Sequence, residues 1–133
     1  MKLYIASYFN TRERLRPYVR QLQDAGHLIT STWLTEPLKP GKIAEETELR
    51  CYTNGELRSF AMQAVDDILS SDVLILDTLD EDPRGGREVE WGAFVFDMID
   101  NGCIVGPKRN VFHELAMKVF PTWEACVEYF KTC

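Results

Sequence analysis

One stretch decides both the fold and the candidate site: DVLILD at positions 72–77, followed after a short loop by RGGREVEWG at positions 84–92. The first segment is an unbroken run of branched apolar residues between two aspartates, which predicts a parallel strand that is buried on both faces. The second begins with two glycines and leads into a helix that we expect over 89–99. Because glycine lets the backbone approach a ligand closely, this junction predicts a binding site.

Glu90 is the first candidate for chemistry in this stretch. It falls in or near the first turn of the expected helix, where the positive end of the helix dipole favours an ionised carboxylate. The neighbouring Val89, Trp91 and Gly92 indicate a packed and closely approached turn rather than a solvated one. An ionised carboxylate beside the end of a strand is a candidate nucleophile.

Strands and helices alternate along the rest of the chain. The apolar patterns predict strands over 3–6, 27–34, 103–106 and 118–120, and helices that end near 26, 69 and 130. Pro17 predicts a late start or a bend in the first of these helices, and Thr53-x-x-Glu56 is a capping box that starts the second. Thr122 is expected to cap the third. The alternation predicts an α/β fold with a doubly wound parallel sheet. Positions 35–55, rich in prolines and acidic residues, predict a lid-like or flexible excursion.

Composition narrows the classes of function. The chain has 133 residues, which predicts one domain, and a net charge of −6, which argues against duplex nucleic acid as a partner. No apolar run approaches the roughly 18 residues of a membrane span, so we expect a cytoplasmic protein. Four scattered cysteines and two histidines match neither a zinc site nor a redox motif, and we expect no metal and no cofactor.

Several further candidates follow the ends of strands, which meet at one edge of a parallel sheet and can share a ligand there. Asp77 closes its strand on the correct side, and Ser7 and Tyr8 follow the first strand. Trp33, at the end of the second strand, is either a core residue or a platform for a planar base. Asn110 is a turn residue or a ligand contact, and His113 is a core or surface residue or a polar contact with the ligand.

The glycine pair has charged neighbours. Gly85 and Gly86 alone match neither the dinucleotide fingerprint nor the P-loop. Arg84 and Arg87 beside them make an anion-binding role as plausible as a structural one.

These segments together resemble the nucleoside 2-deoxyribosyltransferase-like superfamily, most closely its small bacterial and phage branch. The resemblance rests on KLYIAS at 2–7, GHLITSTWL at 26–34, DVLI at 72–75, RGGREVEWG at 84–92, VGP at 105–107 and NVFH at 110–113. It implies a flavodoxin-like five-stranded sheet and cleavage of an N-glycosidic bond, with the base passed to another base or replaced by water. The expected partner is therefore a small nucleoside or nucleotide.

The resemblance also implies roles for individual residues. Glu90 corresponds to the family's glutamate nucleophile, and Tyr4 to the tyrosine that orients it. Asn110 corresponds to a polar residue lent by a neighbouring subunit, which implies a homodimer or a higher homo-oligomer with shared sites. Ser7 and the segment Gly85-Gly86-Arg87 correspond to the region that binds a 5′-phosphate. Asp67 or Asp77 is then the group that protonates or holds the leaving base.

One position departs from the family pattern. Related sequences carry an aspartate that assists the leaving base where this chain has Ala64, one turn before Asp67. Either catalysis is weakened, or Asp67 substitutes, or Ala64 is a deliberate inactivating change. The same departure suggests an alternative function as a noncatalytic nucleotide-binding protein that senses or sequesters its ligand. A third interpretation is a fold that serves only as a partner surface.

Overall fold

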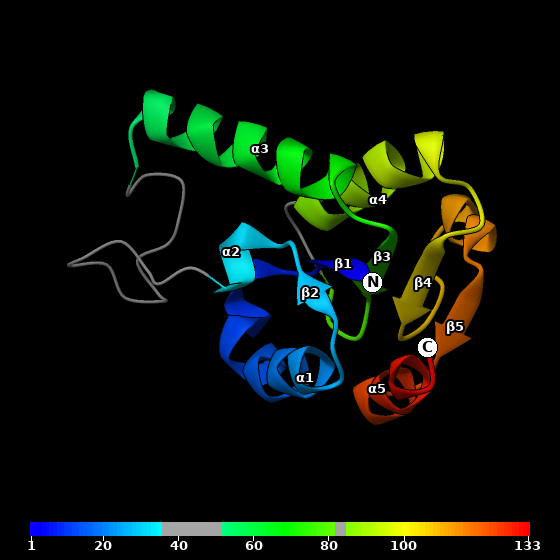
Figure 1. The fold of residues 1–133 in the computed structure, drawn as a ribbon. Coiled ribbons are helices and arrows are strands. Elements are labelled where there is room, and N and C mark those ends of the chain that lie inside the picture. Colours follow the sequence, from blue (N-terminus) through cyan, green and yellow to red (C-terminus); the bar gives the residue numbers. More distant parts are fainter. Residues whose placement is uncertain (36–51, 82–84) are drawn as a thin grey trace.

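The computed structural model describes residues 1–35, 52–81 and 85–133 and shows strands and helices in alternation (Figure 1). Most of the predicted excursion over 35–55 lies outside the described residues. The elements are β1 (Lys2–Ala6), η1 (Phe9–Thr11), α1 (Arg12–Asp24), β2 (Leu28–Ile29), α2 (Thr32–Thr35), α3 (Asn54–Leu69), β3 (Val73–Asp77), α4 (Gly86–Asp97), β4 (Gly102–Val105), η4 (Val111–Leu115), β5 (Lys118–Phe120) and α5 (Trp123–Lys131).

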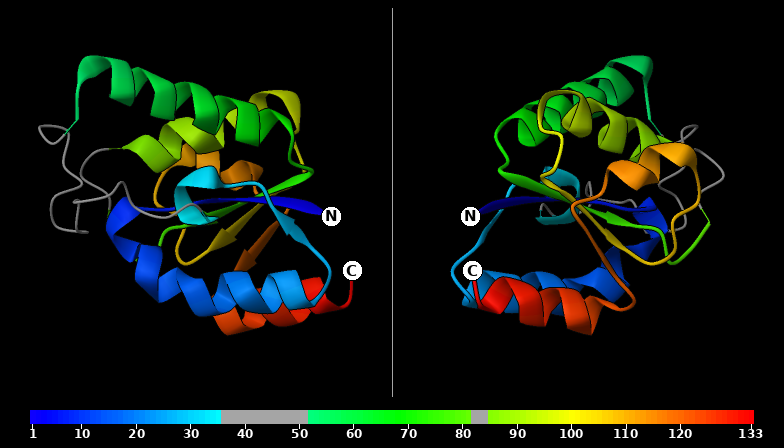
Figure 2. Two further views of the ribbon diagram at one scale, coloured as in Figure 1. Left: turned by 60° about the vertical axis from the view of Figure 1, so that its left-hand side comes forward. Right: turned by 90° about the vertical axis from the view of Figure 1, so that its right-hand side faces the viewer.

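The five strands form one parallel sheet in the order β2-β1-β3-β4-β5. Helices α3 and α4 cover one face, and α1 and α5 cover the other (Figure 2). The predicted doubly wound, flavodoxin-like sheet is confirmed. β1 and β3 lie side by side in the sheet. From β1 the chain continues to β2 on one side, and from β3 it continues to β4 and β5 on the other. Ligands of such folds bind at the carboxyl ends of the strands at this point.

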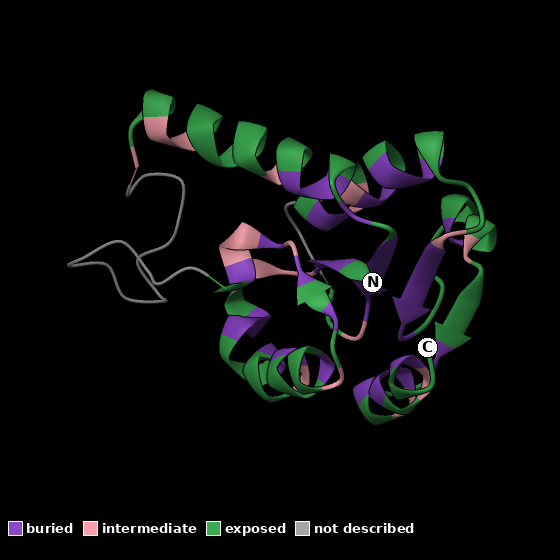
Figure 3. Cartoon of the chain, in the orientation of Figure 1, coloured by how far each residue is buried: buried purple, intermediate pink, exposed green. Residues whose placement is uncertain are grey.

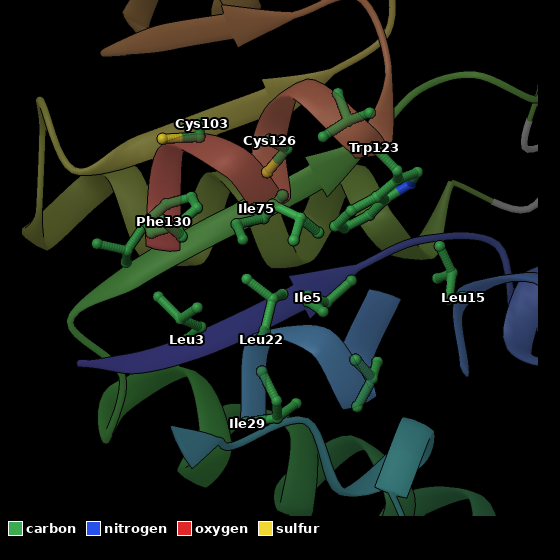
Figure 4. Close-up of a cluster of buried hydrophobic side chains, with 14 of the residues drawn as sticks. Leu3, Ile5, Leu15, Leu22, Ile29, Ile75, Cys103, Trp123, Cys126 and Phe130 are labelled. Carbon is green, nitrogen blue, oxygen red and sulfur yellow. The ribbon is translucent and has the colours of Figure 1, made fainter. Parts of the chain in front are cut away.

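Side chains of the central strands alternate between two cores. Leu3, Ile5 and Ile75 point toward α1 and α5, where they pack in a cluster with Trp123 and Phe130 (Figure 4). The second cluster lies under α3 and α4 and contains Tyr4, Ala6, Ile68, Leu74, Leu76, Trp91, Phe94, Val95 and Ile104. Tyr4 pairs in register with Leu74, so both face α3 and α4. The alternation therefore decides which polar side chains at the sheet edge can meet.

Two expectations about the first third of the chain are wrong. The strand predicted over 27–34 ends at Ile29, and residues 32–35 form helix α2. The reason is a distant contact, because the carboxylate of Asp67 on α3 accepts a hydrogen bond from the Thr32 backbone nitrogen (2.8 Å). In addition, the late start expected from Pro17 is wrong, because α1 begins at Arg12 with Pro17 inside it, whereas the alternative of a bend stays a prediction. Pro17 lies on the exposed side, where water can satisfy the carbonyl group that it leaves without a donor.

The other elements follow the predictions closely. The capping box at Thr53 and Glu56 is formed, with hydrogen bonds of 3.1 Å in both directions, and Thr122 caps α5. Helix α4 begins at Gly86, three residues before the expected start, because Gly85 adopts the left-handed conformation and serves as its N-cap. None of the helices in the described ranges has the length and apolar character needed to cross a membrane.

Replacing Gly102 by alanine tests the packing of α4 on the sheet. An added Cβ would lie 2.5 Å from the ring of Trp91, which is buried and held by a hydrogen bond from its Nε1 to the Phe112 carbonyl. Because that ring cannot move freely, we expect a loss of about 1–3 kcal/mol of unfolding free energy in urea titrations. Gly92→Ala on α4 has nothing within 4 Å of its Cβ and should leave stability unchanged or raise it. Equal midpoints for wild type and Gly102→Ala would contradict this account of the packing.

Candidate active site

Tyr4 and Glu90 meet on the face of the sheet that α3 and α4 cover. Tyr4 is fully buried in β1, and Glu90 is half-buried on α4. The pKa of the Tyr4 hydroxyl is raised well above its ordinary value, first by burial and then by the charges of Glu90 and Asp67. The buried hydroxyl makes no hydrogen bond within the described residues. Tyr4 therefore stays protonated and can donate to a carboxylate. Two carboxyl groups act on this one hydroxyl.

Asp67 reaches this group from α3 and is held by the protein. One of its oxygens accepts from the Thr32 backbone nitrogen (2.8 Å), and the other accepts from Nε2 of Gln63 (2.9 Å). Ala64 lies one turn earlier on the same side of α3 and is half-buried. The structure thus brings together Tyr4, Asp67, Ala64 and Glu90.

Trp33 lies beside this group, on α2 rather than at the end of a strand. Its Nε1 donates to the Ile5 carbonyl (2.9 Å), and its ring packs against that of Phe9 at a centroid distance of 5.9 Å. The side chain is half-buried and contacts both cores. Part of the residue is therefore open to solvent, as a stacking platform requires.

Asp77 does not join Glu90. Its side chain points to the α1 and α5 face and is fully buried. One of its oxygens accepts from Nη2 of Arg14 (3.0 Å), Oγ of Ser7 (3.1 Å) and Nε1 of Trp123 (3.3 Å), and the other accepts from the Leu79 backbone nitrogen (3.0 Å). This saturated carboxylate anchors the ends of β1 and β3 to α1 and α5.

The first βα loop is likewise engaged within the chain. The Ser7 hydroxyl contacts that of Thr11 at 2.8 Å in addition to Asp77. The hydroxyl of Tyr8 accepts from Nδ2 of Asn10 (3.0 Å). Both residues lie at the carboxyl end of β1, as expected, but Ser7 is on the opposite side of the sheet from Glu90.

Arg87 stabilises the loop before α4 from inside the protein. Its side chain is buried, and Nη1 donates to the carbonyl oxygens of Asp77 and Asp80. Gly85 caps α4 and Gly86 is its first residue. Arg84 lies outside the described residues. Arg87 therefore fixes the loop that follows β3 and has little surface to offer a phosphate.

Asn110 and His113 form a third group with Glu88, a residue that the sequence patterns did not single out. The Glu88 carboxylate accepts from Nε2 of His113 (2.8 Å) and from Nδ2 of Asn110 (3.1 Å). Asn110 also caps η4 through its Oδ1, which accepts from the Phe112 backbone nitrogen (2.9 Å). In the sequence, Glu88 stands out only as an acidic residue near the start of a helix. Such residues are common, and this position does not indicate which residue they contact.

No clustering of three or more His, Cys, Asp or Glu side chains suited to a metal ion occurs within 1–35, 52–81 and 85–133. The pKa of the Cys103 thiol is raised to about 12 by burial, and burial raises that of Cys126 as well. These two thiols are therefore poor nucleophiles.

Comparisons with known proteins support the fold. No protein-family model and no curated protein matches the sequence. Among solved structures, the chain is similar to a 2-deoxyribosyltransferase of Bacillus psychrosaccharolyticus, with a TM-score of 0.67 and 18% identity over 97% of this chain and 92% of that one. It is also similar to a CMP N-glycosidase of Clostridium botulinum, with a TM-score of 0.59 and 10% identity over the whole of both chains. These likenesses confirm the flavodoxin-like fold that the superfamily resemblance implied.

Proposed function

We propose that this protein cleaves the N-glycosidic bond of a nucleoside or a nucleoside 5′-monophosphate, by hydrolysis or base exchange, with Glu90 as the nucleophile. The observation that carries the proposal is the placement of the half-buried Glu90 carboxylate beside the protonated Tyr4 hydroxyl. That pairing orients an ionised carboxylate for attack on a sugar carbon. Two fold neighbours act on such bonds, a 2-deoxyribosyltransferase and a CMP N-glycosidase.

In the proposed mechanism a carboxylate oxygen of Glu90 bonds to C1′ while the bond from C1′ to the base nitrogen breaks. The electron pair leaves with the base, which takes up a proton from the Asp67 carboxyl group or from water. Water or a second base then attacks C1′ from the opposite side and releases Glu90, so the configuration at C1′ is retained. In this mechanism the buried Tyr4 hydroxyl donates to one carboxylate oxygen of Glu90 once the substrate is bound, and the other oxygen attacks.

The proposal is tested by incubating the protein with a panel of nucleosides and nucleoside 5′-monophosphates and measuring free base. The panel includes neutral nucleosides because Arg87 is buried and bonded to backbone carbonyls, which removes one of the two arginines expected to hold a phosphate. Addition of a second free base to the reaction separates exchange from hydrolysis. Absence of free base with every substrate would contradict the enzymatic proposal.

Ala64 supports a second candidate, a noncatalytic nucleotide-binding protein. Both oxygens of Asp67 already accept hydrogen bonds from the protein. Asp67 is therefore poorly placed to give a proton to the leaving base. Such a protein would be stabilised against thermal unfolding by nucleotides and would release no base.

Ala64→Asp discriminates between the two candidates. Position 64 is half-buried on the side of α3 that carries Asp67, so a carboxyl group there reaches the same site. We expect base release to rise about a hundredfold or more, since a positioned general acid contributes about 10²–10⁴. Ala61→Asp, on an exposed part of α3, is the matched control. If neither wild type nor Ala64→Asp releases base while both are stabilised by nucleotides, binding alone is the function.

We further propose a cytoplasmic homodimer or higher homo-oligomer whose subunits share sites. Much of α3 and α4 is exposed on the side away from the sheet (Figure 3), and the exposed residues of these helices include apolar ones, among them Phe96 at 86% and Val89 at 73%. On α3, Phe60, Val65 and Leu69 are each at least 50% exposed. Soluble monomers rarely leave so much apolar surface open. A second copy on this face would lie next to the helices that carry Ala64 and Glu90.

Phe96→Asp tests the assembly. Light scattering after size exclusion should show a dimer or larger species for wild type and a monomer for Phe96→Asp, because a buried charge at an interface is costly. Leu28→Asp, exposed on the edge strand β2, should leave the assembly intact. A monomeric wild type at all protein concentrations would refute this part of the proposal.

A further inference from the structure

Glu88 binds the first turn of α4 to the loop that follows β4. Its carboxylate lies 2.8 and 3.0 Å from Nε2 of His113 and accepts from Nδ2 of Asn110 at 3.1 Å. The His113 side chain has no exposed surface, whereas that of Glu88 is 31% exposed. A buried imidazole is therefore committed to a single carboxylate, and the superfamily resemblance gives Glu88 no role.

The imidazole has one defined orientation. Its Nδ1 accepts a hydrogen bond from the Arg109 backbone nitrogen (2.9 Å), so the proton resides on Nε2 and points at Glu88. Arg109 in turn donates from Nε to the Thr78 carbonyl in the loop after β3 (2.8 Å). Glu88 is thus connected through His113 to the ends of two central strands.

Glu88 and Glu90 point to different sides of α4. Two residues along a helix correspond to a rotation of about 200°, so Glu88 faces η4 while Glu90 faces β1. Arg87 and Trp91 lie on the side of α4 that faces the sheet. Arg87 donates to the Asp77 carbonyl (3.0 Å), and Trp91 donates to the Phe112 carbonyl (3.1 Å). A rotation of this turn that releases Glu88 must therefore move the Glu90 carboxylate relative to Tyr4.

We propose that Glu88 and His113 are positioning residues that fix the rotation of α4 and so aim Glu90 at the sugar carbon. The inference rests on the proposed function in that Glu90 is the nucleophile. Glu88 does not touch the substrate in this account. A displacement of about 1 Å in a reacting group can lower a rate about a hundredfold.

Glu88→Ala is the main test, with Glu88→Gln and Glu114→Ala as comparisons. We expect Glu88→Ala to lower kcat about tenfold to a hundredfold with KM within twofold of wild type, after the folded fraction is measured by circular dichroism. Glu88→Gln keeps an oxygen that accepts from His113, so it should restore kcat to within about threefold. Glu114 pairs with Lys108 on the surface of the same region, and its removal should change neither constant. A merely stabilising role would lower the unfolding temperature without lowering kcat per folded molecule.

A crystal structure of Glu88→Ala provides a readout that does not need turnover. We expect the Glu90 carboxylate to shift away from the Tyr4 hydroxyl in that variant and to remain in place in Glu88→Gln. An unmoved Glu90 in Glu88→Ala, or an unchanged kcat, would overturn the inference. If wild type releases no base from any substrate, the proposed function fails separately, and the structural comparison still decides whether Glu88 positions Glu90.

Discussion

Glu90→Gln is expected to reduce base release by about 10⁴-fold while the protein stays folded and still binds its ligand. Glutamine retains the size of the side chain and offers Tyr4 an acceptor oxygen, but its amide oxygen cannot form a stable glycosyl ester. Removal of a nucleophile typically has an effect of this size. Initial rates on the best substrate of the nucleoside and nucleotide panel provide the measurement.

Asp97→Asn is the matched control for this substitution. Asp97 is an exposed acid at the other end of α4, so the same chemical change is made on the same helix far from Tyr4. We expect its rate to equal that of wild type. Turnover by Glu90→Gln above about one hundredth of the wild-type rate would remove Glu90 as the nucleophile.

Asp77→Ala is expected to lower the free energy of unfolding by about 3–5 kcal/mol. The fully buried carboxylate accepts from Arg14, Ser7, Trp123 and the Leu79 backbone nitrogen, and truncation leaves these donors without their acceptor. Urea denaturation followed by circular dichroism measures the loss. Because Asp77 faces α1 and α5, we also expect the fraction that remains folded to release base, contrary to the proton-donor role that the sequence allowed.

Asp80→Ala separates this effect from the loss of a surface ion pair. Asp80 binds the same Arg14 group at 2.9 Å, but its side chain is 54% exposed whereas that of Asp77 is 1% exposed. Exposed ion pairs contribute at most about 1 kcal/mol. Comparable losses from Asp77→Ala and Asp80→Ala would show that burial is not what makes Asp77 important.

The sequence was sufficient for the fold because its signals are local and agree with one another. The apolar run at 73–76, the capping box at 53–56 and the Thr122 cap each report on a few neighbouring residues, and all three elements form. The alternation of these elements then leaves few possible topologies.

The site was predicted less completely because it depends on which face of the sheet each side chain takes. The aspartate at 77 and the tyrosine at 4 both belong to strands that lead into the site, yet the register Tyr4 to Leu74 puts them on opposite faces. Similarly, α2 and the tryptophan on it depend on Asp67, which lies 35 residues from Thr32. The pair Glu88–His113 spans 25 residues. Contacts of this kind leave no periodic pattern in the sequence.

The most direct test of the account is to trap the glycosyl-enzyme. A 2′-fluoroarabinosyl nucleoside, or its 5′-monophosphate, slows release of the sugar because fluorine at C2′ disfavours the positive charge that develops at C1′. Mass spectrometry of the digested protein should then find one fluorosugar attached to the peptide that contains Glu90, and no adduct in Glu90→Gln. A sugar attached to another residue, or consumption of the substrate with inverted configuration and no adduct, would contradict the assignment of Glu90 as the nucleophile.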